Sequence, residues 1–406
     1  MLAILRDTWA LLLGFFVLML GSGLLGSLLG VRAGIESWPP AVTGVVMAGY
    51  YLGFLAAASV VPRLLARVGH IRVFVALGAL ASVVALGHAV LVTPWTWLPL
   101  RLLTGLALCG VYITTESWLN GRTGNATRGR LLAFYMVVQL GGGATGSLLL
   151  SVGALEGMGL FVLAAALLSA ATLPLLLVPG PAPRLGTPRR VAFADVYRNS
   201  PLALVAVFGI GVAQGGLYGG ITAVYAREIG LSVAGIGAFV AATLAGGVLF
   251  QGPAGWLADR FDRRLVVTVT TFLAAGCAAA AALLDPDPAW RIGALFFLLA
   301  GASLPMYSLC VALANDRLDP ARMVGTSGAL LLANGVGSVL GPIGSAGAMQ
   351  LVGPAGFPAF VAAVHAAIGV HAVLRTVRRS PSPLAAAPGS GALQVEKVEV
   401  TATIGK

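Results

Sequence analysis

The chain has 406 residues, of which 58% are hydrophobic and 10% charged, and its mean hydropathy is +0.94. A soluble protein of this composition would have more apolar surface than one core could bury, so the sequence predicts a polytopic membrane protein whose main partner is the lipid bilayer. The net charge of +11 comes from small basic clusters between apolar runs, which argues against a nucleic-acid-binding protein.

Apolar runs recur along the whole chain, and a helix needs about 20 such residues to cross the hydrocarbon core. The run that starts at Trp9 lacks a clear signal-peptide cleavage site and is long enough to span. We therefore predict an all-α membrane protein with twelve transmembrane helices. Their approximate ranges are 8–30, 41–62, 73–94, 97–118, 131–152, 157–178, 201–225, 233–256, 265–284, 291–313, 326–350 and 355–374.

The distribution of the 25 Lys and Arg residues predicts how these helices are oriented. If both termini lie in the cytoplasm, only Arg32, Arg227 and Arg291 fall on the other side, and Arg101 lies within a span. The positive-inside rule describes such a bias toward cytoplasmic loops. We therefore expect an integral protein of the bacterial cytoplasmic (inner) membrane, with both termini in the cytoplasm.

The longest internal polar segment, residues 179–200, is rich in Pro and Arg and follows the sixth span. We expect it to be a cytoplasmic linker between an N-terminal six-helix bundle, residues 1–178, and a C-terminal six-helix bundle, residues 201–379. Residues 380–406 begin with "SPSPLAAAPGSGA", a composition typical of a disordered cytoplasmic tail.

The two halves are weakly similar to each other in a common register. Polar residues match as well as glycines, and glycines alone are too frequent, at 55, to carry the comparison. The polar matches pair Tyr112 with Tyr307, Asn120 with Asn315, Arg122 with Arg317 and Gln139 with Asn334. A six-helix unit repeated in parallel orientation is found in secondary transporters, so we predict two pseudo-symmetric halves.

The decapeptide "GWLADRFDRR" (255–264) places a dense cluster of charges between the eighth and ninth spans. It resembles the loop motif G-x-x-x-D-R-x-G-R-R of the major facilitator superfamily (MFS), although Asp262 stands where the family has glycine. The matching residues are Gly255, Asp259, Arg260, Arg263 and Arg264. The equivalent loop of the first half, 62–72, keeps Arg67 but has Ala66 in place of the acid.

Two further stretches carry the resemblance. "RLLTGLALCG" is similar to the family pattern R-x-x-x-G through Arg101 and Gly105, and residues 116–141 resemble the YcaD-like subgroup of the family. The resemblance covers nearly all of the chain up to Arg379. It implies the MFS fold and transport by alternating access, and it is silent about the substrate.

The resemblance also implies a gate made of charged residues. In the family, the loop motif pairs with neighbouring helix ends and holds the outward-facing state, and here the charged helix end after the tenth span supplies candidate partners. For Glu116 we favour an ion pair with the basic loop that follows over a proton-binding role. The arginines alone could instead be orientation signals. The predicted gating network is Arg67, Glu116, Arg122, Arg128, Arg130, Asp259, Arg260, Arg263, Arg264, Asp316 and Arg317.

Polar residues within the spans are candidates for a substrate cavity. A guanidinium in lipid is costly, so we expect Arg101 to face a cavity, where it would bind an anionic group or control the protonation of a carboxylate; the alternative is snorkelling to the headgroups. For any one of the neutral groups, a structural hydrogen bond between helices is the better expectation. The cavity candidates are Arg101, Tyr112, Gln139, Gln214, Tyr218, Tyr307 and Asn334. The resemblance implies that spans one, four, seven and ten line the cavity.

The leading interpretation is a secondary active transporter that moves a small organic solute by alternating access. Proton-coupled efflux and facilitative uniport both stay open, although no carboxylate stands in the outer or middle part of any predicted span. The alternative from another class is a membrane-embedded enzyme acting on a lipid-linked substrate. Such an enzyme would cluster acids or histidines at one membrane face, so we expect no enzymatic activity.

Cysteine and histidine spacing gives no sign of a metal or cofactor site. Cys109, Cys277 and Cys310 fall singly inside apolar segments, where they are expected to be small core residues. We therefore expect no metal and no cofactor. The expected partners are a small-molecule substrate, with protons as an open alternative, and the bilayer, and we expect a monomer.

Overall fold

The computed structural model describes residues 2–121, 125–177, 196–197, 200–218, 220–315 and 320–377. Within these ranges the chain is helical and contains no β-strand. Twelve helical segments are long and apolar enough to cross a membrane, from Thr8–Ile35 to Gly356–Arg375. The prediction of an all-α protein with twelve transmembrane helices is confirmed.

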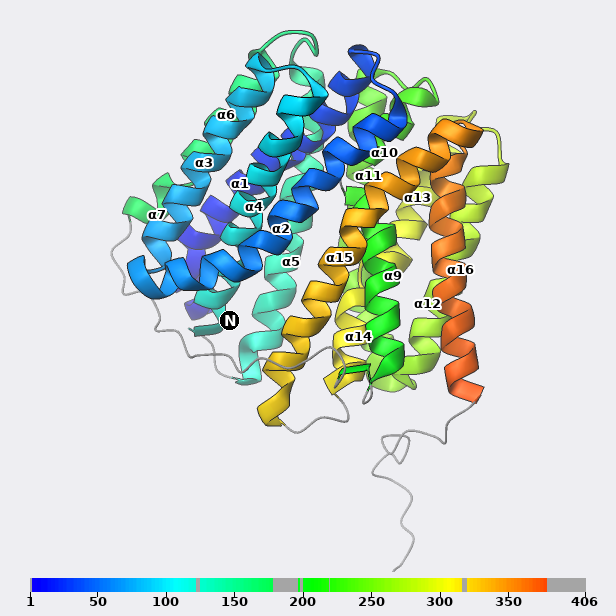
Figure 1. The fold of residues 1–406 in the computed structure, drawn as a ribbon. Helices are drawn as coiled ribbons and strands as arrows, with labels where there is room; N and C mark the ends of the chain where they lie inside the picture. The colour runs from blue at the N-terminus through cyan, green and yellow to red at the C-terminus, as the bar shows by residue number, and fades with distance from the viewer. Residues whose placement is uncertain are drawn as a thin grey trace, which may run out of the picture.

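The helices form two groups, which lie side by side in Figure 1. The first group contains α1 (Leu2–Ile35), α2 (Pro40–Val68), α3 (His70–Val90), α4 (Pro94–Gly121), α5 (Asn125–Leu148), η1 (Leu149–Val152), α6 (Gly159–Ala170) and α7 (Leu173–Leu177). The second contains α9 (Pro201–Tyr218), α10 (Ile221–Glu228), α11 (Val233–Arg260), α12 (Arg263–Leu283), α13 (Ala289–Ser303), α14 (Met306–Asn315), α15 (Pro320–Val352) and α16 (Gly356–Val377). The predicted tail 380–406, and all of the predicted linker 179–200 except residues 196–197 and 200, lie outside the described residues.

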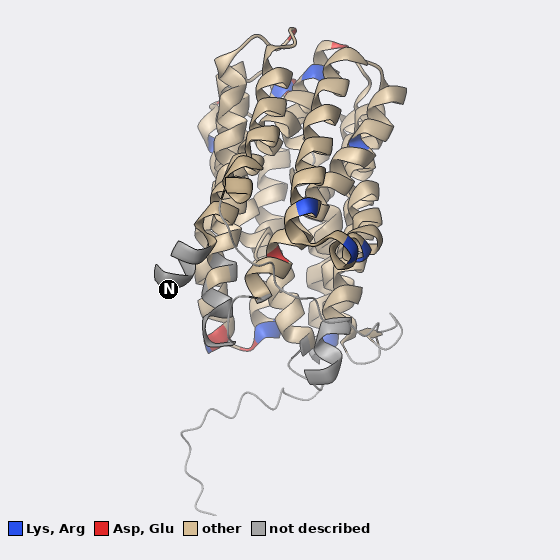
Figure 2. Ribbon diagram, turned by 90° about the vertical axis from the view of Figure 1, so that its left-hand side faces the viewer, with Lys and Arg blue, Asp and Glu red and all other residues tan. Residues whose placement is uncertain are grey.

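Few charges interrupt these helices. In Figure 2 the ribbon is mostly uncharged, and the Lys, Arg, Asp and Glu residues lie mainly near helix ends. This pattern is what a bilayer requires, because a charged side chain in the hydrocarbon region is costly.

Three of the predicted spans are divided into two helices each: the sixth between α6 and α7, and the seventh and tenth at a glycine and a proline. The seventh span ends as α9 at Tyr218 and resumes as α10 at Ile221, because Gly220 takes a left-handed conformation with φ of 88°. The tenth span is interrupted at Leu304 and Pro305, between α13 and α14. A proline lacks the N–H that continues a helix, so Pro305 explains the break in the tenth span.

Both ends of the described chain lie on one side of the bundle (Figure 1). We call the end of the bundle that carries Leu2 and Val377 the terminal face, and the end that carries Ile35 and Pro40 the distal face. Helix α4 therefore begins at the distal face and ends at the terminal face.

The two groups of helices pack together toward the distal face. Helix α2 lies against α15, and α5 lies against α11. The approach is close enough to require glycine: a Cβ on Gly44 would come within 2.6 Å of the Ala346 Cβ. Small residues at such crossings let helix backbones pack tightly in a membrane.

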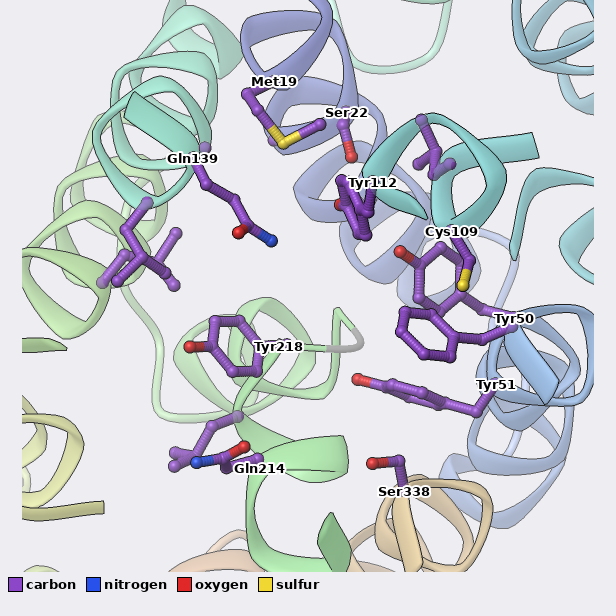
Figure 3. Close-up of a pocket in the computed structure, with 18 of the residues that line it drawn as sticks. Met19, Ser22, Tyr50, Tyr51, Cys109, Tyr112, Gln139, Gln214, Tyr218 and Ser338 are labelled. Atoms are coloured by element: carbon purple, nitrogen blue, oxygen red, sulfur yellow. The ribbon is translucent and has the colours of Figure 1, made fainter. Parts of the chain in front are cut away.

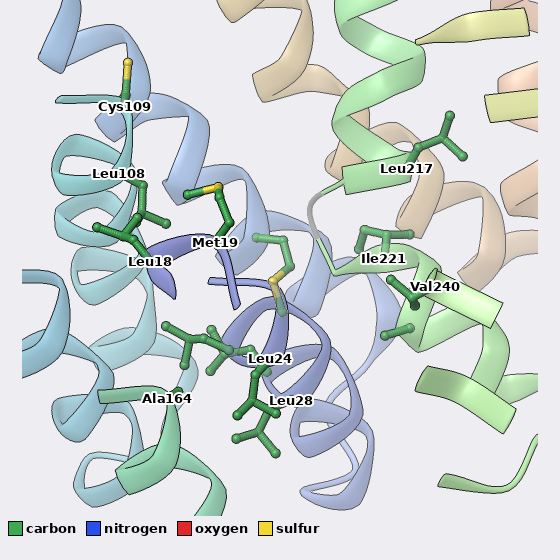
Figure 4. Close-up of a cluster of buried hydrophobic side chains, with 14 of the residues drawn as sticks. Leu18, Met19, Leu24, Leu28, Leu108, Cys109, Ala164, Leu217, Ile221 and Val240 are labelled. Carbon is green, nitrogen blue, oxygen red and sulfur yellow. The ribbon is translucent and has the colours of Figure 1, made fainter. Parts of the chain in front are cut away.

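A buried apolar cluster extends across this junction. Leu24 and Leu28 of α1 belong to the same cluster as Leu217, Ile221 and Val240 of the second group (Figure 4). The two halves are thus held together near the distal face by packing that excludes solvent.

Candidate functional site

A cavity of about 340 Å³ lies between the two halves. Its size is in the range of sites that hold small organic molecules. All seven side chains that the sequence singled out as cavity candidates line it, and several point into it from different helices in Figure 3. They are Arg101 and Tyr112 on α4, Gln139 on α5, Gln214 and Tyr218 on α9, Tyr307 on α14 and Asn334 on α15.

The cavity is elongated along α4. Both Arg101 and Glu116 line it, and they are separated by about 22 Å of helix at 1.5 Å per residue. Glu116 stands five residues before the end of α4 at Gly121, so the cavity reaches to within about 8 Å of the terminal face. The contacts between α2 and α15 lie at the other end.

Aromatic rings from α2 and α4 form the first-half wall of the cavity. The rings of Tyr50 and Tyr51 meet edge to face with their centroids 5.1 Å apart, and the centroid of the Phe54 ring lies 6.4 Å from that of Tyr112. Sequence reasoning missed Tyr50, Tyr51 and Phe54. A signal was present, because Tyr50 and Phe54 are four residues apart and so share one face of a helix.

Arg101 is buried beside this wall, with 4% of its surface exposed. Its guanidinium carbon lies 4.8 Å from the centroid of the Tyr50 ring, which is a cation–π contact. Its Nε has no hydrogen-bond partner, and no Asp or Glu of the described chain forms an ion pair with it. This burial fits a side chain that faces the cavity rather than one that snorkels to lipid headgroups.

The second-half wall presents amides fixed to the backbone. Gln214 donates from its side-chain nitrogen to the carbonyl of Ser303 at 3.0 Å and to that of Leu304 at 3.4 Å. These carbonyls are available because the helix is broken at Leu304 and Pro305. The side-chain nitrogen of Asn334 likewise donates to the Val207 carbonyl at 3.3 Å.

One hydrogen bond crosses from the first half to the second inside the cavity wall. The Tyr51 hydroxyl on α2 donates to the Gly215 carbonyl on α9 at 3.2 Å. Tyr51 is 7% exposed, so this bond lies in a buried part of the junction. It joins the halves on the distal side of the cavity.

Glu116 is the one acidic side chain among the described residues that line the cavity. It lines the cavity, and among the described residues no Lys or Arg forms an ion pair with its carboxylate. The side chains of the predicted partners Arg122, Arg128 and Arg130 lie outside the described residues, so that pairing stays a prediction.

The charged loop after α11 has local explanations for much of its charge. Asp262 caps α12 by accepting a hydrogen bond from the Arg264 N–H at 2.7 Å. Asp259 is 78% exposed and pairs at 3.8 Å with Arg263, and Arg260 stacks over the Trp256 ring at 4.6 Å. Exposed pairs of this kind contribute little to stability.

Whether the other members of the predicted network reach this loop stays a prediction, because most of their side chains lie outside the described residues. Arg67 is exposed in the last turn of α2. Asp316 and Arg317 lie outside the described residues. No group of three or more His, Cys, Asp or Glu side chains that could hold a metal occurs in the described part of the chain.

Known proteins are similar to this chain in sequence. The profile of the Major Facilitator Superfamily matches residues 11–342 and 203–403. A protein of Enterobacter sp. (strain 638), described as an uncharacterized MFS-type transporter, is 29% identical over 85% of this chain and 89% of its own length. The MFS-type transporter YcaD of Salmonella typhi is 28% identical over 94% of this chain and 98% of its own.

Solved transporter structures share the fold at low sequence identity. The nucleoside transporter NupG superposes with a TM-score of 0.74 at 14% identity, covering 91% of this chain and 98% of that one. A bacterial homolog of the human lysosomal transporter Spinster, in an inward-facing conformation, has a TM-score of 0.70 at 16% identity, covering 92% and 95% of the two chains. The predicted resemblance is therefore confirmed: this chain is an integral membrane protein that belongs to the major facilitator superfamily of transporters.

Proposed function

We propose that this protein is a secondary active transporter that moves a small organic solute through the cavity by alternating access. The observation that carries the proposal is the position of the cavity, which both halves line and which the packing of α2 on α15 closes toward the distal face. In this conformation a solute bound there would be shut off from the distal side, as alternating access requires of one of its two states.

We also propose that the terminal face of the protein lies on the cytoplasmic side of the membrane. The bias of Lys and Arg toward the loops on the terminal face supports a cytoplasmic location for that face. The described conformation is then inward-facing, and transport requires the distal contacts to break while the halves close at the terminal face.

Proton coupling has a candidate within the cavity. Glu116 is a carboxylate that lines the cavity without an ion-pair partner among the described residues. A group of this kind can bind and release a proton as the cavity changes its access. We propose this role ahead of facilitative uniport, and we leave the direction of net transport to the measurement.

A reversible lock at the distal face tests alternating access. The Ala41 backbone N–H donates to the Gln350 side-chain oxygen at 3.0 Å across the two halves. An Ala41→Cys, Gln350→Cys double variant, treated with a short thiol-cleavable cross-linker, would hold this side shut. The transported solute would be taken from compounds that raise the melting temperature of the purified protein in a screen of sugars, amino acids, nucleosides and organic acids.

We expect cross-linking to stop flux into proteoliposomes and a reducing agent to restore it. The Ala41→Cys single variant, treated in the same way, should transport normally. Undiminished flux through the cross-linked protein would refute alternating access through this cavity.

A further inference from the structure

The cavity holds a positive charge that the described chain does not neutralise. Arg101 is 96% removed from solvent, its Nε has no hydrogen-bond partner, and its guanidinium lies over the face of the Tyr50 ring. A buried cation without an anion is costly, and a ring face compensates for only part of that cost. An anion entering the cavity would remove the remainder.

The chemistry of the guanidinium limits which anion fits. Its planar fork of N–H donors matches a carboxylate or a phosphate. Arg101 is the only Lys or Arg among the described residues that line the cavity, and Glu116 adds a carboxylate further along. A single cation balances one negative charge, so a monocarboxylate suits this site better than a doubly charged phosphate ester.

The wall around Arg101 limits the rest of the ligand. Tyr50, Tyr51, Phe54 and Tyr112 line the cavity together. Tyr50 and Tyr51 meet edge to face and Phe54 is tilted against Tyr112, so the wall offers ring faces and edges against which a flat apolar body can pack. Opposite them, Gln214 uses its nitrogen to bind backbone carbonyls, which leaves its side-chain oxygen as an acceptor toward the cavity. The aromatic wall therefore suits a ligand with an aromatic ring. A hydrogen-bond donor on that ring could bind to the Gln214 side-chain oxygen on the opposite wall.

We propose that the substrate is an aromatic monocarboxylate, bound with its carboxylate on Arg101 and its ring against the aromatic wall of α2 and α4. The inference rests on the proposed transport function for its physiological meaning, but it makes a claim about binding that can be tested without any flux. The bound anion would lie near the distal end of the cavity, close to the hydrogen bond from Tyr51 to Gly215.

Binding is measured on the purified full-length protein by isothermal titration at about pH 7.5, where carboxylic acids are ionised. The probes are benzoate, 2-naphthoate and indole-3-acetate, each compared with its neutral amide, together with acetate and phenyl phosphate. We expect at least one aromatic acid to bind about tenfold or more tightly than its amide and than acetate. Amides that bind as well as the acids would overturn the role of charge, and acetate binding as well as the aromatic acids would overturn the role of the ring.

Variants separate Arg101 from other positive charges. Arg101→Gln should lower the affinity for the best aromatic acid about tenfold or more while leaving the affinity of its amide unchanged. Arg72→Gln removes the same charge at an exposed position on α3 and should bind like the parent protein. The comparison of acid with amide on the unmodified protein keeps the test decisive even if Arg101→Gln fails to fold.

Each contrary result points to a different error. Failure of all three acids to bind at about 10 mM, or tighter binding of phenyl phosphate than of any acid, would overturn the assignment of a monocarboxylate. An acid that binds through Arg101 but is not transported would contradict the proposed function and leave the binding site standing. Transport of a neutral solute that is unchanged in Arg101→Gln would support the proposed transport function and contradict the aromatic monocarboxylate as the substrate.

Discussion

The hydrogen bond from Tyr51 to Gly215 should control how often the distal face opens. Replacing Tyr51 with Phe removes the hydroxyl and keeps the ring. In the described conformation the hydroxyl donates across the two halves at 3.2 Å, and this bond must break when the halves separate. In the open state the hydroxyl gains water instead, so the net stabilisation of the closed state is about 0.5 to 1.5 kcal/mol.

That free energy corresponds to a roughly twofold to tenfold shift of the equilibrium toward the state that is open at the distal face. The shift can be measured as a distribution of distances between spin labels on exposed positions, for example Val45→Cys on α2 and Leu351→Cys on α15. The native cysteines Cys109, Cys277 and Cys310 are buried, which favours labelling at the introduced sites.

The neighbouring tyrosine supplies the matched control. Tyr50→Phe is the same chemical change one residue away, and no hydrogen bond joins the Tyr50 hydroxyl to the second half in the described structure. We expect its distance distribution to match that of the parent protein. If Tyr51→Phe leaves the distribution unchanged, or if Tyr50→Phe shifts it equally, the bond does not control opening.

Two further predictions concern charged residues. Asp262→Ala should destabilise the protein by about 1 kcal/mol and lower its melting temperature in detergent, because α12 loses its N-cap. Asp262→Asn keeps the hydrogen-bond acceptor and should melt like the parent protein. Equal melting temperatures of the two variants would contradict the capping role. Glu116→Gln should abolish the acceleration of uptake by a pH gradient in proteoliposomes, because the amide cannot carry a proton, while the exposed Glu156→Gln variant should respond as the parent does. A response to the gradient that survives in Glu116→Gln would exclude that residue as the coupling site.

The fold was largely predictable because the bilayer imposes simple rules on the sequence. Runs of apolar residues gave the twelve spans, since a membrane helix must be apolar over its full length. The breaks at Gly220 and Pro305 were harder, because glycine and proline are tolerated within continuous membrane helices as well. Whether such a residue interrupts a helix depends on what the neighbouring helices supply.

The sequence predicted the Arg, Gln and Asn members of the cavity and three of its tyrosines, but not Tyr50, Tyr51 and Phe54. A Gln or Arg in a span stands out against an apolar background, whereas Tyr50 and Phe54 also fit an ordinary lipid-facing or core position. The bond from Tyr51 to Gly215 joins residues 164 apart in the sequence, and its existence depends on how the halves pack. That Glu116 also lines the cavity could not be predicted for the same reason, since its position in the sequence says nothing about which surface it faces.

Because of the break between α13 and α14, the two walls of the cavity should differ in how well they tolerate substitutions. Gln214 satisfies two backbone carbonyls that this break leaves free, so a substitution there would alter ligand contacts and also leave buried polar groups unpaired. A substitution at Phe54 changes only the shape of an apolar surface. New ligand preferences should therefore be easier to select, in the laboratory or in natural descendants of this chain, by varying α2 than by varying α9.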